Sequence, residues 1–539
     1  MFKSVFRPAA GAFCTIVIAL VCYGSLRVAL ATWSLETDTT NLALLVDDVG
    51  EHGLSALGGR RYTVDNWVFS LAPLFAGVLA AFPRSPMAVL VVGWLLSVAA
   101  AALAAVLATR LCDKRLAWPA SFLTFVAAAG SNPETLGAYG FMTYPATHNI
   151  TVVGGLTGLL AAHAYVRDGK IAWLGVSAVL ILLATLSDPW GLAAFVAPLV
   201  LAGALAARFG ASSRLARRLH AVAATFIVVG GLCYTRVLGL LDFLPHAEVV
   251  LAPPEVIAFN IKRGLVALSR MFNLAPWTSG LGGPASRAAA LIDLGALAVL
   301  AGLLIIAFWR RWAQIGADAR FLVAAAVLSC LGVLSSFAIF IFPEGDWVGR
   351  LFLNLAVLVP ALLIAIACNL PEGRLKRPVQ AYGALLLLLA ILSGPLGRPA
   401  SWFAPLPEPN AQGARAFGAF SAEHGLTKGY GPRELRIEGA TWLSNGALKA
   451  YPAVFDGRVW RQGPHQSAAL WYAPPASPGA PEFLVVGEGM AGCPELQLCL
   501  DAAQRQFGPW ARRLEFVSPY EERATVLVWP SSITAKIKH

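Results

Sequence analysis

Long apolar runs constrain the fold of this chain more than any other feature. A helix needs about 20 apolar residues to cross a hydrocarbon core of about 30 Å, and the sequence contains about eleven such stretches. They lie near residues 13–33, 87–109, 116–131, 149–166, 171–187, 190–207, 219–236, 288–308, 321–342, 351–369 and 379–395. The sequence therefore predicts an α-helical polytopic membrane protein.

The composition supports this prediction. Of the 539 residues, 57% are hydrophobic and only 13% are charged, whereas a soluble chain carries about 25% charged residues. No A-x-A-like cleavage site follows the first apolar run, so we interpret it as a retained helix. The net charge of +11 is spread over short segments between apolar runs, which indicates membrane topology and no nucleic-acid partner.

The basic residues occupy alternate connections, such as "TRLCDKR" at 109–115 and "ARFGASSRLARR" at 207–218. The positive-inside rule places these connections and the N-terminus in the cytoplasm, and the opposite connections, including a long segment at 237–287, outside. The alternation requires that "VFSLAPLFAGVLAAF" at 68–82 does not cross the membrane. We expect it to be an interfacial element of a first outer loop, 34–86, because Pro73 disfavours a straight span. A twelfth span is the alternative.

The chain changes character after the last apolar run. We divide it into a transmembrane domain, 1–395, and an outer domain, 396–539, in which short strands near 482–489 and 524–530 and an amphipathic helix near 493–508 predict a small α/β fold. Cys493 and Cys499 are the only cysteines of that domain. Because an oxidising compartment favours disulfides, we expect them to pair.

The predicted outer connections gather acidic and aromatic residues. Ionisable groups at membrane depth usually mark a pathway or a site. Such a cluster suits a reaction in which an acid deprotonates an acceptor hydroxyl while cations hold a lipid-linked phosphate. The acidic, aromatic and histidine residues are Asp38, Glu134, Tyr139, Tyr144, His148, Asp188, Glu344 and Asp346, and the cations are Lys262, Arg263, Arg270 and Arg350.

Several polar residues on this side also have a purely structural interpretation. Asp188 precedes a proline and can simply cap a helix. Asp47 and Asp48 can form the solvated face of a surface helix, and His148 can hydrogen-bond within a loop. Lys262, Arg263 and Arg350 can mark the membrane interface or contact lipid headgroups.

The first quarter of the chain resembles the GT-C superfamily of membrane glycosyltransferases, which use polyprenyl-phosphate-linked sugars. The resemblance rests on an acid and a juxtamembrane helix directly after the first span, "TDTTNLALLVDDVGEHGL". An interfacial segment, "DNWVFSLAPLFAGVLAAF", follows it, and then "PRSPMAVLVVGWLL" and the basic turn "TRLCDKR". "GDWVGRLFLN" loosely matches a later arginine pattern. The tail from "EHGLTKGYGPREL" is similar to bacterial members with a strand-rich outer domain.

The resemblance implies a transferase of the bacterial inner membrane, with its C-terminal domain in the periplasm. In the family, the first outer loop supplies the base, so Asp38 is the expected catalytic base and Asp65 its rival. Arg350, Lys262 and Arg263 would hold the donor phosphate. The expected substrate-binding residues are Trp67, Tyr139, Tyr144, His148, Asp188 and Asp346.

Some members of the superfamily use a divalent metal, and Mg²⁺ or Mn²⁺ could be held by Asp38 with Asp188 or Asp346. The sequence itself assigns no metal site. The implied partners are a polyprenyl-phosphate sugar, a glycan or lipid acceptor, and membrane lipids.

Two other classes of protein remain open. A transporter or flippase also has many spans, although we find no internal repeat of the kind common in transporters. An assembly component of an envelope polysaccharide system would use its outer domain for docking. No P-loop, dinucleotide fingerprint, H-E-x-x-H or G-x-S-x-G motif is present.

Overall fold

A computed structural model describes residues 2–63, 65–130, 143–208, 212–233, 251–271, 302, 316–340, 346–368, 404–474 and 479–538. Its described residues form two compact units. The first unit comprises those of Met1–Trp33, Leu90–Thr235 and Ala247–Glu408. The second comprises those of Ser34–Val89 and Pro409–His539. The predicted domain boundary at 395/396 lies outside the described residues.

The first unit is helical and apolar. Within the described ranges, six helical stretches are long and apolar enough to cross a membrane: Gly11–Thr32, Pro86–Leu111, Asn149–Asp168, Ser213–Leu232, Ala317–Ile339 and Gly349–Cys368. They lie in α1 (Phe2–Thr32), α4 (Pro86–Leu111), α6 (Asn149–Asp168), α9 (Ser213–Leu232), α12 (Ala317–Ile339) and η9–α13 (Asp346–Phe352, Leu353–Cys368). The chain is thus a helical membrane protein, as expected.

The expected number of eleven spans is not confirmed. Three expected spans appear as shorter apolar helices, namely α5 (Ala117–Ala129), α7 (Ile171–Ser187) and the pair η4–α8 (Leu192–Val196, Ala197–Arg208). The expected spans at 288–308 and 379–395 lie outside the described residues.

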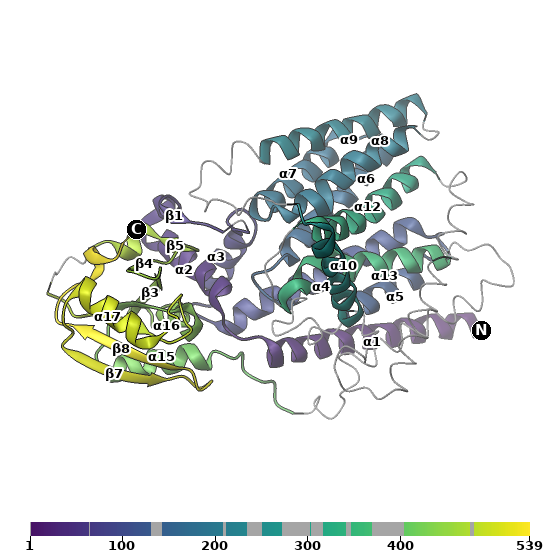
Figure 1. Cartoon of the computed structure of the whole chain (residues 1–539). Coiled ribbons are helices and arrows are strands. Elements are labelled where there is room, and N and C mark those ends of the chain that lie inside the picture. Colours follow the sequence, from purple (N-terminus) through teal and green to yellow (C-terminus); the bar gives the residue numbers. More distant parts are fainter. Residues whose placement is uncertain are drawn as a thin grey trace. The chain divides into compact units, whose positions relative to one another are not determined.

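Small residues let the helices of the first unit approach closely. The helix α6 packs against α7, and α8 packs against both α9 and α12, as the ribbon shows (Figure 1). On α6, a Cβ added at Gly158 would meet Ile181 Cγ1 of α7 at 2.5 Å, and one added at Gly155 would overlap the Phe195 ring. Glycine at these two positions therefore allows the close backbone contact that is typical of packed membrane helices.

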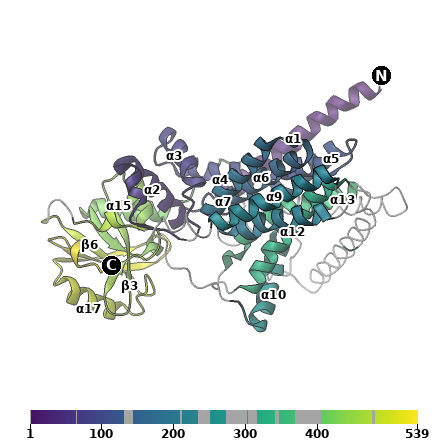
Figure 2. The same ribbon diagram turned by 90° about the horizontal axis from the view of Figure 1, so that it is seen from above.

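The helix α10 (Pro254–Met271) is amphipathic and packs against α12 and η9, and it lies beside α12 in both views (Figure 1, Figure 2). Asn260 on its packed face donates from Nδ2 to the carbonyl oxygens of Ala338 (3.3 Å) and Phe340 (2.9 Å). These bonds satisfy carbonyl groups at the end of α12, which would otherwise lack helical partners.

The second unit is built on a six-stranded sheet with strand order β4-β3-β2-β6-β8-β7. The strands β3 (Lys449–Phe455), β2 (Lys428–Gly431) and β6 (Glu482–Val486) are parallel. The other three, β4 (Trp460–Gln462), β8 (Arg523–Trp529) and β7 (Arg512–Val517), pair antiparallel. With helices α15 (Gln412–Glu423), α16 (Ile437–Leu443) and α17 (Leu496–Phe507), they form the predicted α/β fold.

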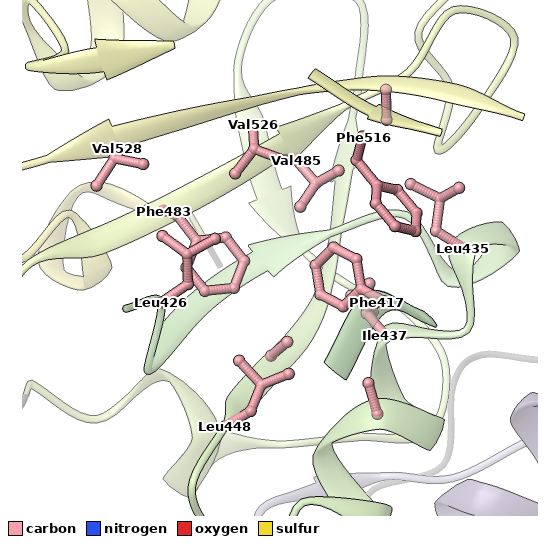
Figure 3. Close-up of a cluster of buried hydrophobic side chains, with 13 residues drawn as sticks. Phe417, Leu426, Leu435, Ile437, Leu448, Phe483, Val485, Phe516, Val526 and Val528 are labelled. Carbon is pink, nitrogen blue, oxygen red and sulfur yellow. The ribbon is translucent and has the colours of Figure 1, made fainter. Parts of the chain in front are cut away.

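Apolar side chains from α15, α16 and the sheet form one core in this unit. Figure 3 shows Phe417 among Phe483, Val485, Phe516 and Val526. The Phe417 and Phe516 rings meet edge to face, with centroids 5.2 Å apart, which is a favourable aromatic geometry. The strands predicted near 482–489 and 524–530 correspond to β6 and β8 and are confirmed.

The predicted first outer loop, 34–86, falls within the Ser34–Val89 segment of the second unit. It forms α2 (Thr37–His52), η1 (Gly53–Leu57), β1 (Arg60–Arg61) and α3 (Leu71–Ala81). The helix α2 packs on α16, and β1 pairs antiparallel with β5 (Ser467–Ala468). The 11 residues of α3 extend about 16 Å, too short to cross a core of about 30 Å. This length supports the interfacial interpretation of 68–82.

Candidate functional site

A small pocket of about 20 Å³, lined mostly by polar residues, lies in the second unit between the start of α2 and the residues around β1 and β5. Its lining combines one carboxylate with carboxamides, hydroxyls and an indole ring. The lining residues are Asp38, Asn41, Leu42, Leu45, Arg60, Tyr62, Thr63, Asn66, Trp67 and Gln466. Two residues singled out from the sequence, Asp38 and Trp67, therefore share one pocket.

Asp38 stands in the first turn of α2, where local sequence fixes its backbone. Glu36 is the N-cap, and its carboxylate accepts hydrogen bonds from the backbone N–H groups of Asp38 and Thr39, both at 2.7 Å. A side-chain oxygen at the N-cap satisfies amides that have no helical partner. The positive end of the helix dipole also favours a negative charge at Asp38.

The two oxygens of Asp38 have different surroundings. Oδ1 accepts a hydrogen bond of 3.1 Å from Nε2 of Gln466. Oδ2 accepts no hydrogen bond from any residue that the structure describes, and the side chain is only half-buried. One oxygen is thus anchored while the other is open to a hydroxyl that enters the pocket.

Asp48 and Arg60 form a buried ion pair behind the pocket. Arg60 Nη1 lies 2.9 Å from Asp48 Oδ2, and Arg60 Nη2 donates to the carbonyl oxygen of Asn41 at 2.9 Å. The Arg60 guanidinium lies 4.9 Å from the centre of the Trp471 ring, and Trp471 Nε1 donates to Asp48 Oδ2 at 3.1 Å. Burial raises the pKa of Asp48 to about 6, although Arg60 opposes that shift.

The solvated-face interpretation of Asp48 is therefore wrong. Asp48 is only 9% exposed, and its partners come from β1 and from the C-terminal part of the chain. Asp47, its neighbour, behaves more as expected, since it is half-buried and pairs with the half-buried Arg84 at 3.6 Å.

Trp67 is buried and sits in an unusual backbone conformation. Its φ of +59° is in the left-handed region, which is rare for a large side chain. Its carbonyl oxygen accepts the N–H groups of Leu71 and Ala72, each at 3.0 Å, at the start of α3. Strained residues of this kind persist where the surroundings fix them, and they cluster at functional sites. Asp65, the rival base, lies in the same loop but does not line the pocket.

A second buried carboxylate adjoins the pocket wall. Glu438 on α16 is 1% exposed, and its Oε1 accepts from Asn41 Nδ2 and pairs with Arg433 Nε, both at 3.2 Å. Burial raises the pKa of Glu438, while Arg433 lowers it. Asn41 thus links Glu438 of α16 to Arg60. These hydrogen bonds fix the Asn41 side chain in the pocket wall that also contains Asp38.

A buried histidine–aspartate pair lies in the first unit, where α6 begins and α7 ends. His148 Nδ1 is 2.5 Å from Asp188 Oδ2, which also accepts from Thr151 Oγ1 at 2.8 Å. Asp188 Oδ1 accepts from the backbone N–H of Trp190 at 3.1 Å. Asp188 therefore does cap the start of the next helical segment, and it also orients His148. Tyr144, also buried, accepts on its carbonyl oxygen from Asn149 Nδ2 at 3.3 Å.

The expected phosphate-binding residues also belong to the first unit. On α10, Lys262 is exposed, and the Arg263 guanidinium lies 5.5 Å from the centre of the Phe259 ring. Arg350 is in η9, which packs against α10. Asp346 begins η9. Tyr139, Glu134 and Glu344 lie outside the described residues.

The residues around Asp38 do not suit a divalent cation. Mg²⁺ and Ca²⁺ prefer several oxygen ligands, usually with more than one carboxylate. Asp38 is the only carboxylate among the described lining residues, which also include the Arg60 cation. Across the described ranges, no three His, Cys, Asp or Glu side chains gather into a group that could hold a metal.

The C-terminal α/β region carries the disulfide expected from the sequence. Cys493 and Cys499 are bonded to each other, across the start of α17. This crosslink ties the loop after β6 to the helix.

Fold and site together define a helical membrane protein whose α/β unit holds a polar pocket around one carboxylate. No family model and no curated protein matches the chain. Among solved structures, it is similar to the Archaeoglobus fulgidus oligosaccharyltransferase tethered with an acceptor peptide that contains the NVT sequon. The TM-score is 0.49 at 12% identity, over 95% of this chain and 74% of that one.

A complex of the same Archaeoglobus enzyme with Zn and sulfate gives a TM-score of 0.48 at 12% identity, over 94% of this chain and 72% of that one. Similarities of this size carry no argument about activity. The function of this chain has to follow from its own residues.

Proposed function

We propose that the chain is a GT-C-type glycosyltransferase of the bacterial inner membrane. It transfers a hexosyl or pentosyl group from a polyprenyl-phosphate donor to a hydroxyl of an envelope glycan or lipid acceptor at the outer face. The observation that carries this proposal is the pocket in which Asp38, anchored through one oxygen, shares its walls with Trp67 and several amide and hydroxyl groups.

The lining suits a neutral, hydroxyl-rich acceptor. Asn41, Asn66 and Trp67 are buried in the pocket wall. The half-buried side chains of Asp38, Thr63 and Gln466 are therefore the polar groups of the lining that an acceptor hydroxyl can reach. Arg60 is the only cation among the described lining residues, and Asp48 already pairs with it. The pocket is therefore better suited to an acceptor hydroxyl than to the donor phosphate.

In the proposed reaction, Asp38 acts as the general base. The acceptor hydroxyl gives its proton to Oδ2 of Asp38, and the acceptor oxygen forms a bond to the anomeric carbon of the donor sugar. The bond between that carbon and the phosphate oxygen breaks, and its electron pair leaves with the polyprenyl phosphate. No step in this scheme needs a metal ion.

Arg350, Lys262 and Arg263 are proposed to hold the leaving phosphate. Arginine suits phosphate because its planar fork can donate two hydrogen bonds. The packing of α10 against η9 supports the grouping of these three cations. Tyr139, Tyr144, His148 and Asp346 are proposed to contact the donor sugar, with Asp188 holding His148 in one orientation.

A transporter is the second candidate. His148 and Asp188 are ionisable groups buried together in the apolar helical unit, and such groups are also found on transport pathways. Proteoliposomes containing the purified protein and a polyprenyl-phosphate sugar with a labelled sugar group separate the two candidates. The transferase forms a labelled glycoside when a glycan acceptor is added. Labelled sugar that crosses the bilayer without any new glycoside would favour the transporter.

The proposed orientation predicts opposite accessibility for two exposed positions. Lys114→Cys, in the connection after α4, should react with a membrane-impermeant thiol reagent only after permeabilisation. Glu488→Cys, after β6, should react in intact spheroplasts. The six cysteines outside the disulfide would first be replaced. Labelling of both positions from the same side would contradict the orientation.

A further inference from the structure

Gln466 brings the C-terminal part of the chain to the pocket. It directly precedes β5, which pairs with β1 through Arg61 and Ser467. The backbone N–H of Ala469 also donates to the carbonyl oxygen of Gly59 at 2.8 Å. Two residues of each strand and one flanking hydrogen bond therefore fix where the Gln466 side chain begins.

The carboxamide of Gln466 donates to two acceptors of the first loop. Nε2 lies 3.1 Å from Asp38 Oδ1 and 3.3 Å from Thr63 Oγ1. The Thr63 hydroxyl donates in turn to the carbonyl oxygen of Asp65 at 3.3 Å, so it is an acceptor toward Gln466. Both hydrogens of the amide nitrogen are thus used, and the reverse orientation would set the amide oxygen against a carboxylate.

Gln466 holds this position in a strained backbone conformation. Its φ is +45°, in the left-handed region that a glutamine rarely adopts. Its Oε1 is buried and accepts no hydrogen bond from the described residues. A strained residue with an unsatisfied acceptor destabilises a fold, so its contact with Asp38 is better explained by function than by stability.

We propose that Gln466 is the positioning residue of Asp38, a role that rests on the proposed glycosyl transfer. Its N–H anchors Oδ1 and leaves Oδ2 directed to the acceptor hydroxyl. The C-terminal α/β region is then part of the catalytic machinery.

The effects on kcat and KM, together with a double variant, test this role. Gln466→Ala should lower kcat about 10- to 100-fold, the usual effect of losing a hydrogen bond to a charged group, with the KM for the donor unchanged. In the Asp38→Asn background, Gln466→Ala should cause no further loss of kcat, because Gln466 acts through Asp38 and effects of coupled residues do not add.

Gln497→Ala is the matched control, since Gln497 is an exposed glutamine of the same unit whose side chain, within the described ranges, bonds only to Asp501. It should leave both kcat and the KM for the donor unchanged. A purely structural role for Gln466 would reduce the amount of folded protein and leave kcat per folded molecule at the wild-type value, and that result would overturn the proposal.

The outcome for Asp38→Asn separates this inference from the proposed function. If that variant loses turnover while Gln466→Ala keeps the wild-type kcat, only the role of Gln466 is wrong. If Asp38→Asn turns over normally, the base assignment fails as well.

Discussion

Asp38→Asn should lower steady-state turnover at least about 100-fold, because an amide cannot accept the acceptor proton and general-base catalysis typically contributes that much. Asparagine keeps the size of the side chain and can still bond to Gln466 through its oxygen. The KM for the donor should therefore stay close to that of the wild type. Turnover is measured with purified protein, a polyprenyl-phosphate sugar and a glycan acceptor.

Two other carboxylates serve as comparisons for Asp38. Asp47→Asn, on the same helix but outside the pocket lining, should turn over at the wild-type rate. Asp65→Asn decides between the rival bases. A loss at Asp65 that exceeds the loss at Asp38 would transfer the base role to Asp65.

Arg60→Ala should destabilise the second unit by about 3–5 kcal/mol. The substitution leaves the Asp48 carboxylate buried without its ion-pair partner, and breaking a buried pair in this way is strongly destabilising. It also removes the guanidinium from the Trp471 ring. Unfolding of residues 409–538 can be followed by pulse proteolysis of the full chain in detergent across a urea series.

The control for Arg60 is Arg84→Ala, which breaks the half-exposed pair with Asp47 in the same unit and should cost no more than about 1 kcal/mol. Replacing both partners together, as Arg60→Met with Asp48→Leu, should cost less than Arg60→Ala alone, because no buried charge is left uncompensated. Equal losses for Arg60→Ala and Arg84→Ala would contradict the buried pair.

The sequence predicts the fold class because that class depends on local patterns. Apolar runs of spanning length and the short continuous apolar runs of buried strands such as β6 and β8 are both visible along the chain. The number of spans is less predictable, since α5, α7 and η4–α8 are apolar but are shorter than the runs that suggested them. The two-residue strand β1 carries too little pattern to be recognised.

Only some of the pocket residues can be predicted from the sequence, because local patterns do not show which distant residues meet. Asp38 and Trp67 stand out because they lie in a short acidic loop after the first span. Gln466 is 428 positions away from Asp38, and no local pattern connects the two. The prediction of a solvated Asp48 is wrong because it follows the usual behaviour of an acid on an amphipathic helix. The partners of Asp48, Arg60 and Trp471, are visible only in three dimensions.

A single-turnover measurement tests the role of Asp38 most directly. Steady-state rates can be limited by product release, whereas the first turnover, with enzyme in excess over labelled polyprenyl-phosphate sugar, reports on the chemical step. Wild-type protein should convert the label to glycoside. Asp38→Asn, with the same urea midpoint, should convert it at least about 100-fold more slowly. Equal first-turnover rates for the two proteins would contradict the role of Asp38 as general base.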